Sequence, residues 1–85
     1  MAVVLPPDVS AAQVEAVMRR GAGPLLERVG VFDEYRAAEF EGRSVAWRLI
    51  FRAPDRTLRD EEIDPIVKRI LTLLREELSV RLRES

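Results

Sequence analysis

The chain has 85 residues, of which 47% are hydrophobic and 34% are charged, and its formal net charge is −1. A chain of this length has room for one domain with one core, so we expect residues 1–85 to fold as a single unit. It contains neither cysteine nor histidine, which excludes disulfides and thiolate metal sites and removes the commonest general base. The near-neutral charge argues against nucleic-acid binding through bulk electrostatics alone. We expect neither a metal nor a cofactor.

The N-terminal segment has the features of neither a signal peptide nor a membrane anchor. The apolar stretch Ala2–Leu5 has no basic region before it, unlike a signal peptide. No apolar run approaches the ~20 residues that a membrane span needs. We therefore expect a cytoplasmic protein. Because the apolar run begins directly after Met1, we also expect that residues are missing upstream.

The first elements predicted are a short strand and a helix. Ala2–Leu5 has strand character and is closed by two prolines, which do not donate to a sheet. Ser10 and Gln13 have the spacing of a capping box. They predict a helix over about Ala11–Arg20, with Gly21 as its left-handed stop and Gly23-Pro24 as a further stop directly after it.

Two strands are predicted next, as a hairpin. Residues 26–36 are rich in β-branched and aromatic types, and Gly30 and Asp33 interrupt their alternation, which favours a bulge. Residues 37–42 predict a turn that ends on a glycine suited to a positive φ. Residues 43–52 form the clearest strand, with one wholly apolar face. That face consists of Val45, Trp47, Leu49 and Phe51.

A second helix and a last strand complete the chain. The helix is predicted to begin near Asp60, where acidic residues crowd the first turn. The alternative is a start with Asp64 as cap and Pro65 as the first helical residue. The last strand is predicted over Ser79–Glu84. The apolar positions that keep the helical period are Ile63, Ile66, Val67, Ile70, Leu71, Leu74 and Leu78.

The order strand, helix, strand, strand, helix, strand predicts an α+β fold of the ferredoxin-like βαββαβ type. Its four-stranded antiparallel sheet has the order 4-1-3-2, and both helices cover one face. By alternation the other face should present arginines, with Ile50 and Ala46 between them. These arginines are Arg48, Arg52, Arg81 and Arg83, with Arg36 added if the bulge allows.

Exposed arginines on a sheet have two interpretations. Arginine makes bidentate contacts with phosphate and stacks on unpaired bases, so the face could bind RNA. Long polar side chains on an open face are also what any antiparallel sheet shows to water, and they discourage aggregation at the edges. The pattern alone favours a binding module, and it does not identify the partner.

Three segments together resemble a known family. They are the F-D-x-Y element at 32–35, S-V-A-W-R-L at 44–49 and F-R-A-P-D-R-T-L-R-D-E-E at 51–62. In this order and spacing they resemble the ferredoxin-fold anticodon-binding domain at the C-terminus of the bacterial phenylalanyl-tRNA synthetase beta chain. The resemblance covers nearly the whole chain. One departure is the segment 37–43, which is shorter than usual and lacks a lysine pair, so that only Arg43 precedes Ser44.

The resemblance implies binding to the anticodon stem and loop of tRNA(Phe), as part of a synthetase with an alpha chain and the rest of the beta chain as partners. Adenylation, aminoacyl transfer and editing would take place elsewhere, and this domain would be non-catalytic. The candidate RNA-binding residues are Arg36, Arg43, Arg48, Arg52, Arg81 and Arg83.

Several motif residues are expected to serve the fold. Phe32 should pack in the core or at the bulge. Asp33 should accept hydrogen bonds from backbone or from an arginine such as Arg56. Pro54, Arg56, Thr57 and Leu58 should shape the turn into the second helix.

Two other function classes are open at this point. A freestanding or excised protein-interaction module would use the same open face, through Ile50 and Ala46. An enzyme is not favoured, because no acid–base pair and no nucleophile with its base can be assembled from the sequence.

Overall fold

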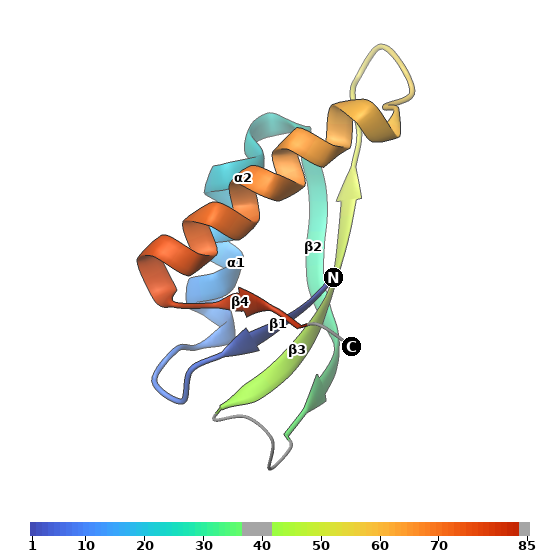
Figure 1. Cartoon of the computed structure of the whole chain (residues 1–85). Coiled ribbons are helices and arrows are strands. Elements are labelled where there is room, and N and C mark those ends of the chain that lie inside the picture. The colour runs from blue at the N-terminus through green and yellow to red at the C-terminus, as the bar shows by residue number, and fades with distance from the viewer. Residues whose placement is uncertain (37–41, 84–85) are drawn as a thin grey trace.

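The computed structural model describes residues 1–36 and 42–83. One sheet has the strand order β2-β3-β1-β4, with every neighbouring pair antiparallel. This is the predicted order 4-1-3-2, and the predicted ferredoxin-like fold is confirmed (Figure 1). The elements are β1 (Ala2–Leu5), α1 (Ala11–Ala22), a 3-10 turn (Gly23–Leu25), β2 (Leu26–Tyr35), β3 (Arg43–Phe51), α2 (Asp60–Leu78) and β4 (Arg81–Leu82).

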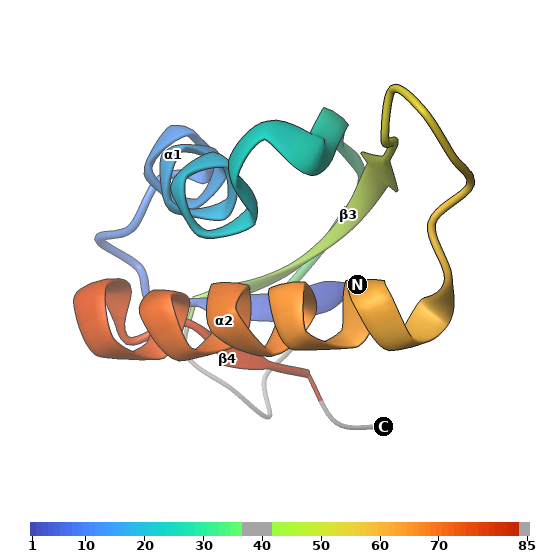
Figure 2. The same cartoon turned by 90° about the horizontal axis from the view of Figure 1, so that it is seen from above.

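The core lies between the two helices and one face of the sheet (Figure 2). Trp47 and Val45 of β3 are buried there, and Leu49 and Phe51 pack beside them at the edge of the core, as the alternation predicts. The other buried residues come from β1, α1 and α2 and include Val3, Leu5, Val14, Met18, Ile70 and Leu74. Because these residues face the helices, the opposite face of the sheet is left open.

Helix α1 begins as predicted and ends later than predicted. The capping box is present, since the Ser10 amide donates to Gln13 Oε1 (2.8 Å) and the Gln13 amide donates to Ser10 Oγ (3.2 Å). The positive φ of 70° belongs to Gly23, so Gly21 is not the stop. A Cβ on Gly21 would lie 3.1 Å from Leu73 Cδ1. This glycine therefore serves the close approach of α2 to α1.

Helix α2 begins at Asp60, with Arg59 as its N-cap residue. The alternative start at Pro65 is wrong. Three acidic residues in the first turn, at 60–62, favour the earlier start because the helix dipole stabilises negative charge there. Pro65 is the sixth helical residue, and since it has no amide hydrogen the ladder loses one bond at that point.

Strand β4 is shorter than predicted, because its first two expected residues belong to the end of α2. Ser79 has a φ of 57°, and its amide donates to the Arg75 carbonyl (3.2 Å). The Val80 amide donates to the Leu74 carbonyl (3.1 Å), and the Val80 side chain is buried. This left-handed helix end leaves only Arg81–Leu82 to pair as a strand. Residue 84 lies outside the described residues.

The hairpin strands contain the predicted bulge. The register between β2 and β3 shifts between Val31 and Asp33, and again between Leu26 and Arg28. Gly42 has the predicted positive φ of 82°. The rest of the predicted turn, 37–41, lies outside the described residues.

Candidate nucleic-acid interface

The pairing register defines which residues share the face away from the helices. Gly30 pairs with Arg48, Arg28 with Ile50, and Tyr35 with Ser44. Directly opposed residues of antiparallel strands point to the same face, and that face alternates along each strand. We call this surface the open face. It consists of Ala2, Val4, Arg28, Gly30, Phe32, Asp33, Tyr35, Ser44, Ala46, Arg48, Ile50 and Arg81, together with Arg83 just after β4.

One aromatic–arginine pair lies on the β2–β3 side of the open face. The Arg48 guanidinium carbon is 5.3 Å from the centroid of the Phe32 ring, within the range of a cation–π contact. Phe32 is 60% exposed, so the expected position in the core is wrong, while the expected position at the bulge agrees with the register shift between Val31 and Asp33. Phe32 has the same parity on β2 as Arg28 and Gly30, which belong to the open face, so alternation turns it away from the core.

A second pair crosses the sheet. The Arg83 guanidinium carbon is 4.8 Å from the centroid of the Tyr35 ring, although Tyr35 belongs to β2 and Arg83 follows β4. The Arg83 amide donates to the Ala2 carbonyl (2.9 Å), which fixes its backbone beside β1. Ser44, on the strand between, is only 3% exposed although it faces away from the helices. The two long side chains thus span the central strands of the open face.

Five of the six predicted arginines are exposed, and three of these five belong to the open face. Arg48, Arg81 and Arg83 are exposed on the open face, as expected. Arg36 is exposed directly after β2. Arg52 follows β3 and is exposed, with its Nε 3.4 Å from Glu27 Oε2.

Arg43 does not lie with the other predicted arginines. It pairs with Leu5 in the register, which puts its side chain on the helix side of the sheet. That side chain is 16% exposed, and its Nε is 2.8 Å from Glu34 Oε1. Arg43 therefore lies apart from the open face, and its binding to RNA stays a prediction.

Arg28 is a residue of the open face that sequence reasoning missed. It is exposed and pairs with Ile50. The sequence did contain a signal for Arg28, since Arg28 and Gly30 have the same parity on one strand, but the irregularity after Leu26 hid the alternation.

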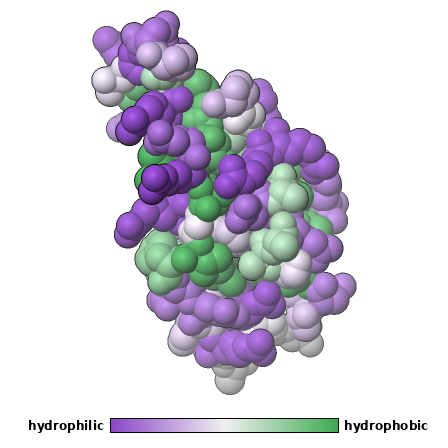
Figure 3. All heavy atoms as spheres, turned by 180° about the vertical axis from the view of Figure 1, so that it is seen from behind, coloured by the Kyte–Doolittle hydropathy of each residue, from purple (hydrophilic) through white to green (hydrophobic). Residues whose placement is uncertain are grey.

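Exposed hydrophobic side chains also reach the surface in small areas among hydrophilic ones (Figure 3). The large ones are Val31, Phe32, Tyr35, Ile50 and Leu82.

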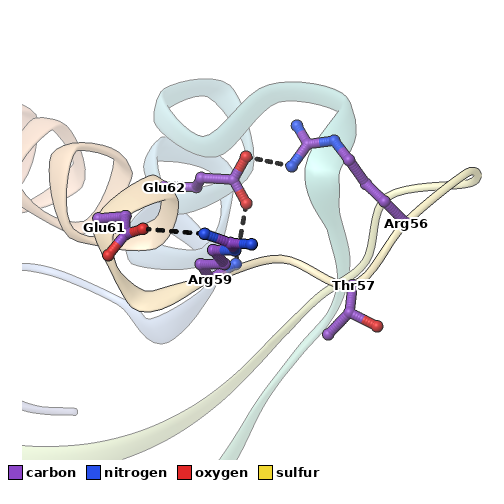
Figure 4. A pocket seen from close by; sticks show the side chains of 5 residues that line it. All are labelled: Arg56, Thr57, Arg59, Glu61 and Glu62. Carbon is purple, nitrogen blue, oxygen red and sulfur yellow. Dashed lines mark hydrogen bonds and ion pairs between the residues drawn. The ribbon is translucent and has the colours of Figure 1, made fainter.

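The loop before α2 forms a separate cluster of charged groups (Figure 4). Glu62 accepts a hydrogen bond from the Arg59 amide (2.8 Å) and forms an ion pair with Arg56. The backbone hydrogen bond from Arg59, followed by the side-chain hydrogen bond from Arg56, lowers the pKa of Glu62 from its ordinary value of 4.5. Arg56 thus ties the loop to the helix, which agrees with the structural role expected of it.

Asp33 does not use Arg56 as its partner. Its Oδ1 accepts from the Glu34 amide (2.9 Å), so the backbone half of the expectation is right and the arginine half is wrong. The physical reason is that Arg56 is held by Glu62 on α2.

Other kinds of site find no support in the part of the chain that the structure describes. No group of three or more Asp or Glu residues within 1–36 and 42–83 could hold a metal ion. None of the helices there is long and apolar enough to span a bilayer.

Comparison with known proteins matches nearly the whole chain, rather than one surface of it, to a family. The model of the ferredoxin-fold anticodon binding domain matches residues 1–83. Similar curated proteins are phenylalanine–tRNA ligase beta subunits. Those of Synechococcus sp. strain JA-3-3Ab and Corynebacterium efficiens are 42% and 45% identical over 85 residues, and that of Symbiobacterium thermophilum is 44% identical over 77 residues.

These alignments cover 98%, 98% and 88% of this chain, in the same order, and 10%, 10% and 9% of the relatives. The chain therefore spans about a tenth of the length of the curated relatives it matches.

Proposed function

This chain belongs to the ferredoxin-fold anticodon-binding domain family, and on that premise we propose that it binds the anticodon stem-loop of tRNA(Phe). It does so as a non-catalytic part of a phenylalanine–tRNA ligase. The similarity to beta subunits of that ligase supports the choice of tRNA. The alpha chain and the remainder of the beta chain are the protein partners in this proposal.

The observation that carries the proposal is the pairing of arginine and exposed aromatic side chains on the open face. Phe32 with Arg48 and Tyr35 with Arg83 form two such pairs. An exposed ring offers a surface on which an unpaired base stacks, and a nearby guanidinium binds the phosphate next to it. A stem-loop supplies both groups, since its loop bases are unstacked and its backbone is anionic.

The charge balance sets the expected strength of binding. With a net charge of −1, the chain cannot rely on long-range attraction, and only the local arginines neutralise phosphates. We therefore expect weak binding by this chain alone, with a shallow salt dependence. In the complete ligase the other domains add contacts with the same tRNA, and this domain contributes position more than affinity.

The test is a nuclear magnetic resonance titration of the chain with an RNA hairpin of the tRNA(Phe) anticodon stem-loop sequence. Amide shifts are expected to concentrate on β2, β3 and the segment around Arg83. A hairpin with the same stem and a scrambled loop is the control, and its shifts should be smaller. Shifts confined to α1 and α2 would overturn the proposed surface.

The second candidate is a protein-interaction module that uses the same face. The exposed side chains of Ile50 and Phe32 favour it, because apolar side chains on a sheet also suit a protein partner. Under this candidate the hairpin leaves the spectrum unchanged, and sedimentation detects self-association that charge reversal on the open face abolishes.

A further inference from the structure

The open face contains a hollow of about 270 Å³ between β2 and β3. We call it the Gly30 hollow. Its lining includes Arg28, Gly30, Phe32, Arg48 and Ile50, all of which belong to the open face. The register explains the grouping, since Arg28 pairs with Ile50 and Gly30 pairs with Arg48.

A missing side chain creates the hollow. A Cβ on Gly30 would meet no atom within 4 Å, so the space above this residue is open. Gly30 does not have a positive φ, and therefore the backbone does not require glycine here. A strand interior is a place where glycine costs stability, and it often marks a close approach by a ligand or another chain.

The walls combine apolar surface with positive charge. Phe32 and Ile50 are exposed hydrophobic residues, and Arg28 and Arg48 are the charged residues of the lining. The lining contains no carboxylate, and within the described ranges 1–36 and 42–83 neither arginine forms an ion pair. The hollow at the loop before α2 differs, because its two arginines, Arg56 and Arg59, are already paired with Glu62 and Glu61.

We propose that the Gly30 hollow is the subsite for one unstacked nucleobase of the bound RNA loop. The base lies over Gly30 against the Phe32 ring, and Arg28 binds the phosphate of that nucleotide. The volume is slightly below the range of pockets for drug-sized ligands, which suits a single ring system. The lining has two arginines and no carboxylate. This charge favours an anionic nucleotide over an uncharged apolar side chain of a protein partner. This inference rests on the proposed function and adds to it the place of one nucleotide.

Gly30→Val is the direct test, because its Cβ would enter the hollow with no atom within 4 Å and valine favours strands. Its affinity for the tRNA(Phe) anticodon hairpin is expected to fall about tenfold, which is the order of one lost base stack. Phe32→Leu, which keeps an apolar side chain and removes the ring, should lose a similar factor. Ala16→Val, on the exposed side of α1, is the matched control and should bind like the wild type.

A second probe identifies the nucleotide. Hairpins that carry an abasic site at one loop position at a time are titrated with the wild type and with Gly30→Val. At one position the abasic site should weaken the wild type about tenfold and leave the variant unchanged, because the same stack is already absent.

The outcomes separate the two levels of the proposal. If the wild type does not bind the hairpin, the proposed function itself fails. If the wild type binds and Gly30→Val and Phe32→Leu bind equally well, the subsite is overturned while the proposed function stands. Circular dichroism and urea unfolding show that each variant is folded before its affinity is compared.

Discussion

The guanidinium of Arg83 lies 4.8 Å from the ring centroid of Tyr35, although these residues come from the two opposite edges of the sheet. The contact joins the C-terminal segment to β2 over β1 and β3. Since β4 has only two residues, this contact and the Arg83–Ala2 backbone hydrogen bond hold an edge that has little pairing of its own.

Replacement of Arg83 by glutamine should loosen that edge. The loss of a cation–π contact at an exposed site is expected to cost about 0.5–1 kcal/mol of the free energy of unfolding. Urea unfolding of Arg83→Gln, Tyr35→Leu and the double variant forms a cycle that isolates the pair. Purely additive losses would show that the two side chains do not interact in solution.

Glu62 gives the chain a pH-dependent contribution to stability. Its pKa in the folded chain is lowered by the Arg59 amide and by Arg56. A lowered folded pKa means that the contribution is complete above the ordinary pKa of 4.5 and is lost as the pH falls through the lower folded value. Glu62→Gln should therefore be less stable than the wild type at pH 7, and the difference should shrink in acid.

The measurement is urea unfolding of both proteins at a series of pH values from neutral to strongly acidic. Glu61→Gln is the control, because Glu61 is more exposed than Glu62 and its ion pair with Arg59 is longer, at 3.7 Å. It should change stability less at neutral pH. A Glu62→Gln difference that is constant across the series would contradict the assigned cause.

Gly21 is predicted to be intolerant of side chains. A Cβ there would lie 3.1 Å from Leu73 Cδ1 and 3.2 Å from Ile70 Cγ1, so valine would force α1 and α2 apart. Gly21→Val should cost about 1–3 kcal/mol through overpacking. Ala16→Val on the same helix faces solvent and should lose only the smaller difference in helix propensity, well under 1 kcal/mol. Equal losses in thermal or urea unfolding would contradict the close packing.

The regular elements could be predicted from the sequence because their periods are clean. The alternation from Val45 to Phe51 fixed one face of β3, and the capping box at Ser10 fixed the start of α1. The end of α1 was misplaced because Gly21 and Gly23 are both plausible stops. Only the packing against α2 shows that Gly21 belongs to the helix.

The candidate site was predicted in part, because the open face follows from alternation and the bulge does not. Arg48, Arg81 and Arg83 lie where alternation puts them. Phe32 shares the parity of Arg28 and Gly30, whereas Asp33 and Tyr35 reach the open face only through the register shift. The contact of Arg83 with Tyr35 depends on the reach of two side chains across the sheet. Arg43 was included as the basic residue that remains before Ser44 in the resemblance, and its parity puts it on the helix side.

The central claim is that the open face binds the RNA, and charge reversal tests it most directly. Arg48→Glu with Arg81→Glu changes the open face. Lys68→Glu with Arg69→Glu makes the same change in net charge on exposed positions of α2. Fluorescence titration with the tRNA(Phe) anticodon hairpin at one fixed salt concentration compares both variants with the wild type. We predict that affinity falls at least tenfold for the open-face variant and little for the α2 variant; equal losses, or a larger loss for the α2 variant, would contradict the account.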